Sequence, residues 1–320
     1  MSQAGAEKIR NVGFFGHGGT GKTTLIEHIL FAAGKTSRVG RVEDGNTVGD
    51  YLEEEIQRQQ TISMKLIHVD WRGTRVHLVD HPGYADFAGE VAASAPVLDG
   101  LVVVLDATTG IQVGTDTAFH YANQCQVPRA VFVNKLDREH TDFEEAVAQL
   151  QKAYGPQLVP LVIPVGQADS LKVVANVLDD SIEGVEEAIA KARATLTDLA
   201  AESDDVLLEK YLEEGELTPE EFTRGLRLGI RTGKIVPILA GSAAKGLGAQ
   251  GLMNLLAELF PTPLERRIVA RKDDQDVSIE VNPDGPFLAQ VFRTMVDPYV
   301  GQLTFFRVLS GTLRSDSEFY

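Results

Sequence analysis

Residues 16–23 have the sequence Gly16-His17-Gly18-Gly19-Thr20-Gly21-Lys22-Thr23, and this motif points to the fold. It fits the pattern Gly, four residues, Gly-Lys-Thr, which is typical of loops that bind the phosphates of a nucleotide. Its glycines allow backbone N–H groups to point at the phosphates, and the following helix directs its positive end to the same place. The loop lies between an apolar run at residues 11–15 and a helical pattern at residues 23–33. We therefore predict a strand, a phosphate-binding loop and a helix.

Apolar runs and helical patterns alternate along much of the remaining chain. Two extended runs, at residues 63–70 and 74–80, flank a turn at Arg72-Gly73, and uninterrupted apolar runs follow at 101–105 and 130–133. Such runs are typical of strands that are buried on both faces, as in a parallel sheet. The alternation predicts an α/β fold with a mostly parallel, doubly wound sheet.

One acidic segment, at about residues 156–233, departs from this alternation. Helices are expected in it at residues 179–187 and 202–216. Thr218 and Glu221 form a capping box with Pro219 at the first helical position, which predicts the start of another helix. We interpret the segment as a helical subdomain inserted into the sheet domain, whose last strand is expected at residues 235–240.

The end of the chain has a different character. Residues 265–285 are charged and end in Asn282-Pro283-Asp284-Gly285, which predicts a linker with a turn. Short β-rich runs follow, and too few strands are available to close a barrel. We therefore expect a first domain over residues 1–275 and the incomplete start of an all-β barrel domain over residues 276–320.

Composition narrows the class of protein. The hydrophobic content of 43% is normal for a packed globular chain, and the net charge of −16 argues against unaided, non-specific binding to nucleic acid. No apolar run approaches the roughly 20 residues that span a bilayer, and the N-terminus has no apolar signal core. From the sequence we expect a cytoplasmic, monomeric protein that binds neither membranes nor DNA.

A second motif, Asp80-His81-Pro82-Gly83, ends the strand expected at residues 74–80. A carboxylate at this place can hold a water bound to Mg²⁺, and the N–H of Gly83 can approach a γ-phosphate. In the phosphate-binding loop, Lys22 is expected to reach the β- and γ-phosphates and the hydroxyl of Thr23 to bind Mg²⁺.

Two further motifs follow predicted strands and concern the base. In Asn134-Lys135-Leu136-Asp137, the carboxylate of Asp137 can accept hydrogen bonds from N1–H and the exocyclic amine of guanine, an edge that adenine lacks. Asn134 and Lys135 are expected to hold the loop and cover the base. A backbone N–H of Gly241-Ser242-Ala243 could bind the guanine O6. Together these motifs predict guanine selectivity.

These four motifs, in this order, resemble those of the GTPase superfamily, and finer details resemble its translational group. These details are Gly16-His17, Thr24 after Thr23, a first switch from Asp50 to Thr61-Ile62, and a second switch from Asp80 to Phe87. Residues 297–301 and 303–308 resemble the opening of the second domain of elongation factor G. The resemblance covers about residues 10–320, and the insertion after Gly155 also fits that family.

The resemblance implies GTP or GDP and Mg²⁺ as cofactors, and the ribosome, with its proteins and RNA, as the partner that stimulates hydrolysis. Thr61 would close on Mg²⁺ and the γ-phosphate when GTP is bound, as switch loops do. Catalysis would then involve Lys22, Thr61, Gly83 and the residue after it, where the family has a histidine that positions the attacking water.

Three positions depart from the family pattern: Tyr84 replaces that histidine, Gly19 replaces an aspartate, and Gln59-Gln60 replace Gly-Ile. These changes resemble the elongation factor G-like paralogues. Tyrosine, with a pKa near 10, is a poor base, although positioning is the main need in phosphoryl transfer. Three hypotheses remain. The first is a GTPase that acts on the ribosome, and the second is a ribosome-associated GTP-binding module with little hydrolysis. The third is a relative of ribosome-protection or release factors.

Overall fold

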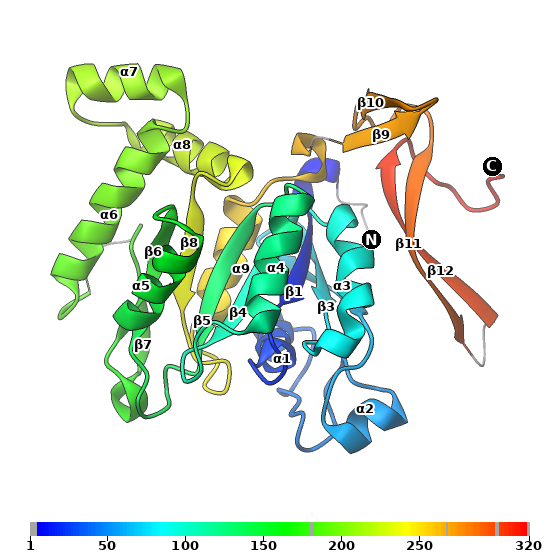
Figure 1. The fold of residues 1–320 in the computed structure, drawn as a ribbon, viewed down its shortest axis with the longest axis horizontal. Helices are drawn as coiled ribbons and strands as arrows, with labels where there is room; N and C mark the ends of the chain where they lie inside the picture. Colours follow the sequence, from blue (N-terminus) through cyan, green and yellow to red (C-terminus); the bar gives the residue numbers. More distant parts are fainter. Residues whose placement is uncertain (1–4, 179–181, 267, 298–300, 319–320) are drawn as a thin grey trace.

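The computed structural model describes residues 5–178, 182–266, 268–297 and 301–318. Its centre is an eight-stranded sheet with the order β2-β3-β1-β4-β5-β8-β6-β7 (Figure 1). The strands are β1 (Ile9–Phe15), β2 (Lys65–Trp71), β3 (Thr74–Asp80), β4 (Gly100–Asp106), β5 (Arg129–Asn134), β6 (Leu158–Val165), β7 (Val173–Asn176) and β8 (Val236–Ala240).

The sheet is mostly parallel, which confirms the predicted α/β fold. Across the sheet, the six strands β3-β1-β4-β5-β8-β6 pair in parallel with their neighbours. The described edge strands β2 and β7 pair antiparallel with β3 and β6. All seven residues of β4 are buried, as its continuous apolar sequence predicts for a strand covered on both faces.

Helices cover both faces of this sheet. α1 and α9 pack together and both contact β3, whereas α4 packs on β1 and β4; Figure 1 shows α4 in front of the sheet and α9 behind it. The covering helices are α1 (Lys22–Ala32), α3 (Ala88–Ser94), α4 (Val113–Gln124), α5 (Phe143–Tyr154) and α9 (Ala249–Glu258), and the short α2 (Glu53–Arg58) lies between β1 and β2 in the chain. Single 3-10 turns are η1 (Ala6–Lys8), η2 (Ala85–Phe87), η3 (Ala95–Val97), η4 (Ala168–Ser170) and η5 (Pro263–Glu265). None of the described helices has the length and apolarity to cross a bilayer.

The segment at residues 156–233 contains the expected helices but does not begin with them. Its first part forms β6 and β7, which extend the central sheet, and only then come α6 (Glu186–Ala201), α7 (Asp205–Glu214) and α8 (Pro219–Thr232). The helix expected at residues 179–187 starts only at Glu186, and residues 179–181 lie outside the described part. The capping box before α8 is confirmed, because Glu221 accepts from the Thr218 N–H at 2.9 Å and Thr218 accepts from the Glu221 N–H at 3.3 Å.

Two antiparallel hairpins follow the sheet domain. β9 (Ile268–Lys272) pairs with β10 (Gln275–Ile279), and β11 (Leu288–Asp297) pairs with β12 (Gly301–Ser310). The prediction of a linker at residues 265–285 is therefore wrong over the first hairpin, and the boundary expected between residues 275 and 276 falls inside β10. The second hairpin forms the start of a β domain, as predicted.

The topology determines where a ligand can bind. The carboxyl ends of β1, β3, β5 and β8 lie at one edge of the sheet because these strands are parallel. The four sequence motifs follow these four strands directly, so the fold brings them together at this edge, where doubly wound sheets bind ligands.

Candidate nucleotide-binding site

The phosphate-binding loop has a backbone that requires glycine. Gly16, Gly19 and Gly21 have φ angles of 141°, 77° and 93°, a region that side chains disfavour. A Cβ atom at Gly16 would lie 2.3 Å from the carbonyl oxygen of Val104. The loop ends at Gly21, which is the N-cap of α1, so the positive end of this helix faces the loop.

The side chain of Lys22 points back to the loop that precedes it. Its ammonium group donates to the carbonyl oxygens of Gly16 at 3.0 Å and His17 at 2.9 Å. Burial lowers the pKa of Lys22 to about 8, and the nearby carboxylate of Asp80 opposes this shift. The side chain therefore keeps its charge at neutral pH and presents it within the loop.

Two hydroxyl groups and two carboxylates form a buried chain next to the loop. Thr23 Oγ1 donates to Asp80 Oδ2 at 2.8 Å and lies 3.1 Å from Thr61 Oγ1, which donates to Asp50 Oδ1 at 2.8 Å. The second carboxylate oxygens, Asp80 Oδ1 and Asp50 Oδ2, are buried without a hydrogen-bond partner. Burial raises the pKa of Asp80 to about 7 and also raises the pKa of Asp50.

This arrangement fits a hard divalent cation. Mg²⁺ prefers oxygen ligands and binds through one or two carboxylates together with phosphates and waters. A cation beside the orphaned carboxylate oxygens would offset the cost of burying them unpaired. The described residues contain no group of three or more His, Cys, Asp or Glu side chains placed to hold a metal ion, so at this site the protein offers hydroxyl groups beside two carboxylates. Asp50 was not among the metal ligands expected from the sequence.

Buried carboxylates hold the segment that leads to Thr61. Glu55 is fully buried, forms an ion pair with Lys65 at 2.7 Å and accepts from the N–H groups of Ile62 at 3.1 Å and Ser63 at 3.3 Å. Glu27, on α1, accepts from the N–H groups of Gly40 and Val48 further upstream. These contacts fix the place of the first switch segment, with Thr61 buried beside Thr23.

The second switch segment lies directly on the phosphate-binding loop. A Cβ atom at Gly83 would lie 2.5 Å from Lys22 Nζ and 2.6 Å from Gly18 N, so only glycine allows this approach. The ring of Tyr84 lies over Gly18, where a Cβ atom would be 2.5 Å from the ring, and its centroid is 6.2 Å from that of His17.

His81 and Pro82, which the sequence motif includes, are both buried. The imidazole of His81 lies in the core: Nε2 is 2.5 Å from Ser94 Oγ, the ring packs edge-on against Phe15 at 4.3 Å, and burial lowers its pKa to about 3. Its side chain therefore supports the strand end and does not face the loop.

Asn134 joins the phosphate-binding loop to the loop after β8. Its Nδ2 donates to the carbonyl oxygen of Thr20 at 2.7 Å, and its Oδ1 accepts from the N–H of Ala243 at 2.7 Å. The other two N–H groups of the segment 241–243 donate to Val133 and Leu247. All three N–H groups of this segment thus have acceptors within the protein, and that of Ala243 holds Asn134 in place. The sequence-based expectation that a backbone N–H here binds guanine O6 stays a prediction.

The other residues of the base motif are placed around Asn134. Lys135 has a positive φ of 64° and forms an ion pair with Asp106 at 2.6 Å, a partner that the sequence alone did not indicate. Asp137 has one carboxylate oxygen, Oδ1, that is buried without a partner. This orphaned acceptor fits the N–H donors on the edge of guanine. Among the remaining predicted residues, Ser242 and Thr20 are buried, and Thr24 is partly buried on α1.

The glycine-rich loop, the two switch segments and the base loops define the class: a nucleotide-binding domain with a phosphate-binding loop. The family profile of the elongation factor Tu GTP binding domain matches residues 7–262. The chain therefore belongs to this family, the translational GTPases.

Individual relatives agree with this assignment. Elongation factor G of Chlamydia trachomatis serovar D is 35% identical over 338 aligned residues, which cover 98% of this chain and 49% of that protein. The same protein of serovar A has the same identity and coverage. A crystal structure of a Thermus thermophilus protein has a TM-score of 0.85 and 32% identity, and the match covers 96% of this chain and 46% of that one. The chain thus spans about half the length of these relatives.

Proposed function

We propose that this chain binds GTP and GDP together with Mg²⁺ and hydrolyses GTP to GDP and phosphate while acting on the ribosome. Family membership supports GTP hydrolysis in general. The observation that carries the proposal is the buried chain Asp80–Thr23–Thr61–Asp50, which joins the phosphate-binding loop to both switch segments and leaves carboxylate oxygens without partners.

Each residue has a role that follows from its place. Lys22 and the loop N–H groups would hold the β- and γ-phosphates, and Thr23 and Thr61 would bind Mg²⁺, which Asp80 supports through a water. Bound there, the cation would neutralise the negative charge that develops on the phosphates. The N–H of Gly83 would hold the γ-phosphate. Asn134 and Lys135 would fix the base loop, in which Asp137 selects guanine.

Tyr84 would orient the attacking water without acting as a base. Its ring already lies on the phosphate-binding loop, so the phenol needs no large movement to reach that region. The alternative function is a ribosome-associated GTP-binding module with little hydrolysis, because a phenol replaces the family's imidazole. The exposure of Tyr84, at 43%, favours neither role by itself.

The experiment that separates these two functions replaces Tyr84 with histidine and measures ribosome-stimulated GTP hydrolysis in a single turnover. If Tyr84 is a working residue, Tyr84→His leaves the rate unchanged or lowers it. A large gain would instead identify the wild-type protein as a lapsed catalyst and support the binding-module function.

Guanine selectivity has its own test. We expect Asp137→Asn to lose GDP affinity by at least tenfold, because it replaces one of the acceptors of a bidentate pair by a donor. Asp205→Asn, at an exposed position in the first turn of α7, is the matched control and should bind GDP like the wild type. Equal affinities for GDP and ADP in the wild-type protein would contradict the proposal.

The partner and the setting are part of the same proposal. We propose the ribosome, with its proteins and RNA, as the partner of a monomeric, cytoplasmic protein that binds neither membrane nor DNA. We also propose that residues up to about 275 form the GTP-binding part, with the insertion at about residues 156–233, and that the strands after it open a β-barrel domain.

A further inference from the structure

One side chain of the second β hairpin reaches both switch segments. Arg293, on β11, donates from Nη1 to the carbonyl oxygen of Met64, and the same nitrogen lies 3.4 Å from Glu90 Oε2. Glu90 Oε2 in turn accepts from the N–H of Met64 at 3.0 Å. The side chain of Arg293 is 14% exposed and that of Glu90 is 30% exposed, so the junction is largely shielded from water.

The two partners of Arg293 belong to different loops of the nucleotide site. Met64 follows Thr61 closely and leads into β2, whereas Glu90 lies in α3, the helix that follows Gly83 and Tyr84. A single guanidinium group therefore connects the exit of the first switch segment with the helix of the second. Phe305, its cross-strand neighbour on β12, supports this position, with its ring centroid 5.9 Å from the guanidinium carbon.

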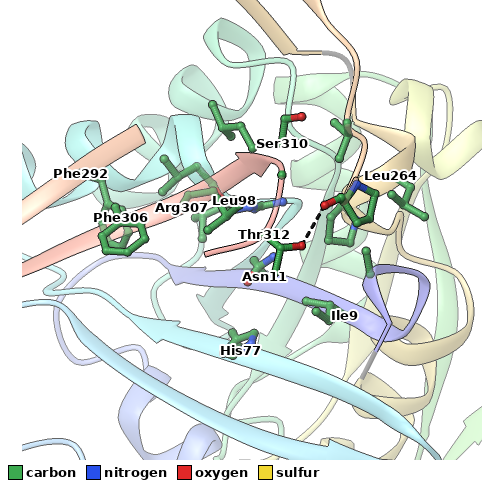
Figure 2. A pocket seen from close by; sticks show the side chains of 18 of the residues that line it. Ile9, Asn11, His77, Leu98, Leu264, Phe292, Phe306, Arg307, Ser310 and Thr312 are labelled. Carbon is green, nitrogen blue, oxygen red and sulfur yellow. Dashed lines mark hydrogen bonds between the residues drawn. The ribbon is translucent and has the colours of Figure 1, made fainter. Parts of the chain in front are cut away.

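The contact between the second hairpin and the sheet domain is open in two places. A cavity of about 660 Å³ separates much of it from β1 and β3 and is lined in part by Ile9, His77, Leu98 and Phe306 (Figure 2). A second cavity, of about 480 Å³, lies beside Met64 and Arg293. Phe292 of β11 packs against the hydrophobic core, and polar anchors on the same hairpin add to this apolar contact.

The second polar anchor lies away from the nucleotide site. Arg307, on β12, forms an ion pair with the buried Asp99 at 2.7 Å and donates to the carbonyl oxygen of Val97 at 2.5 Å. Asp99 also accepts from the backbone and side chain of Asn11. Val97 ends η3, Asp99 directly precedes β4 and Asn11 lies within β1, so Arg307 holds the same hairpin through residues outside both switch segments and α3.

We propose that Arg293 is a positioning residue that couples the second β domain to both switch segments, so that a shift of β11 changes the placement of Thr61 and Gly83. The proposal rests on the proposed nucleotide-dependent function of these segments. Coupling of this kind is reciprocal: a partner that moves the second domain alters nucleotide binding, and nucleotide alters the affinity for that partner.

The test compares Arg293→Ala with Arg307→Ala, which removes a similar anchor away from the switch segments. In hydrogen exchange without nucleotide, Arg293→Ala should speed exchange at residues 59–66 and 84–94 by fivefold or more, whereas Arg307→Ala should leave these peptides unchanged. In a second measurement, Arg293→Ala should change the dissociation rate of a fluorescent GDP by about fivefold or more, the lower end of typical coupling, and Arg307→Ala should not.

A third variant guards against loss of folding. Arg293→Lys keeps the positive charge, but its side chain is one bond shorter and lacks the planar guanidinium, so its ammonium group falls short of the place of Nη1 and the variant should show the same local increase in exchange. Equal effects of Arg293→Ala and Arg307→Ala, or unchanged exchange in both Arg293 variants, would overturn the coupling. Hydrogen exchange is measured without nucleotide, so it tests the coupling even if the wild-type protein does not bind GDP. Failure to bind GDP would refute only the proposed function.

Discussion

Removal of the Asn134 side chain tests whether the phosphate-binding loop and the base loops form one unit. In the structure this carboxamide donates to Thr20 and accepts from Ala243, both at 2.7 Å. Asn134 is 1% exposed, and the two residues that it joins are 2% and 1% exposed. Asn134→Ala would therefore leave a buried carbonyl oxygen and a buried N–H without partners.

The magnitude follows from the two groups left behind. A buried donor or acceptor without a partner costs about 1–3 kcal/mol, so the pair would cost about 2–6 kcal/mol if nothing relaxed. Entry of a water into the space of the lost carboxamide would recover part of this cost. We therefore expect the free energy of unfolding to fall by about 2–4 kcal/mol.

Urea denaturation without nucleotide measures this loss, provided that the slope with denaturant is the same in both proteins. The control is Asn123→Ala, since Asn123 is exposed and accepts from Arg129 at 2.6 Å at the surface. We expect the control to cost about 0.5 kcal/mol or less. A loss below about 1 kcal/mol in Asn134→Ala, or equal losses in the two variants, would show that Asn134 does not join the two loops into one unit.

Three further predictions concern the switch segments and the sheet. Gly83→Ala should slow GTP hydrolysis by about 100-fold, because its Cβ would meet Lys22 and the loop backbone and displace a phosphate-binding N–H. The control Gly89→Ala has open space around it and should not slow hydrolysis. Equal rates in the two variants would contradict the close approach of Gly83 to the loop. Glu55→Gln should lower the free energy of unfolding, measured by urea denaturation, by about 3 kcal/mol, because it breaks a buried ion pair. The control Glu54→Gln lies in an exposed pair with Arg58 and should cost about 0.5 kcal/mol or less. A similarly small loss in both variants would show that the ion pair of Glu55 is not needed for stability. Burial, with neighbouring positive charges, lowers the pKa of His77 to about 4. The contribution of neutral His77 to the free energy of unfolding is therefore complete above about pH 6.5 and is lost as the pH falls toward 4. His77→Gln should reduce the loss of stability between about pH 7.5 and 5 by at most about 2 kcal/mol, and identical pH profiles of the two proteins would contradict this.

The sequence predicts the parts of the site whose residue types are imposed by the ligand. Phosphate binding requires glycines and a lysine before a helix, and this is why the loop ending in Lys22 and Thr23 could be placed without a structure. Continuous apolar runs similarly predict the buried strands, such as β4. In both cases the information lies within a short stretch of the chain.

The parts that escaped prediction depend on contacts between distant residues. Asp50, Glu55 and Glu27 look like ordinary surface charges in an acidic sequence, and only folding shows that they are buried against hydroxyl, ammonium and N–H groups. His81 stands inside a nucleotide motif, yet the strand geometry turns its polar ring into the core against Phe15.

Two strand regions were missed for local reasons. β6 contains Pro160 and Pro164, which argue against a strand inside a sheet, and the structure accommodates Pro160 at an irregularity in its pairing with β8. The strands of the first hairpin are charged, and β10 is mostly exposed, so they lack the apolar alternation that identifies a strand.

We propose that this protein is a working GTPase of the translational group. Single-turnover hydrolysis of GTP, measured with and without ribosomes and with ATP as the comparison, is the test. We expect hydrolysis of GTP but not of ATP, with a rate that rises when ribosomes are added. Tight GTP binding with no hydrolysis in either condition would leave a nucleotide-gated binding module in place of an enzyme.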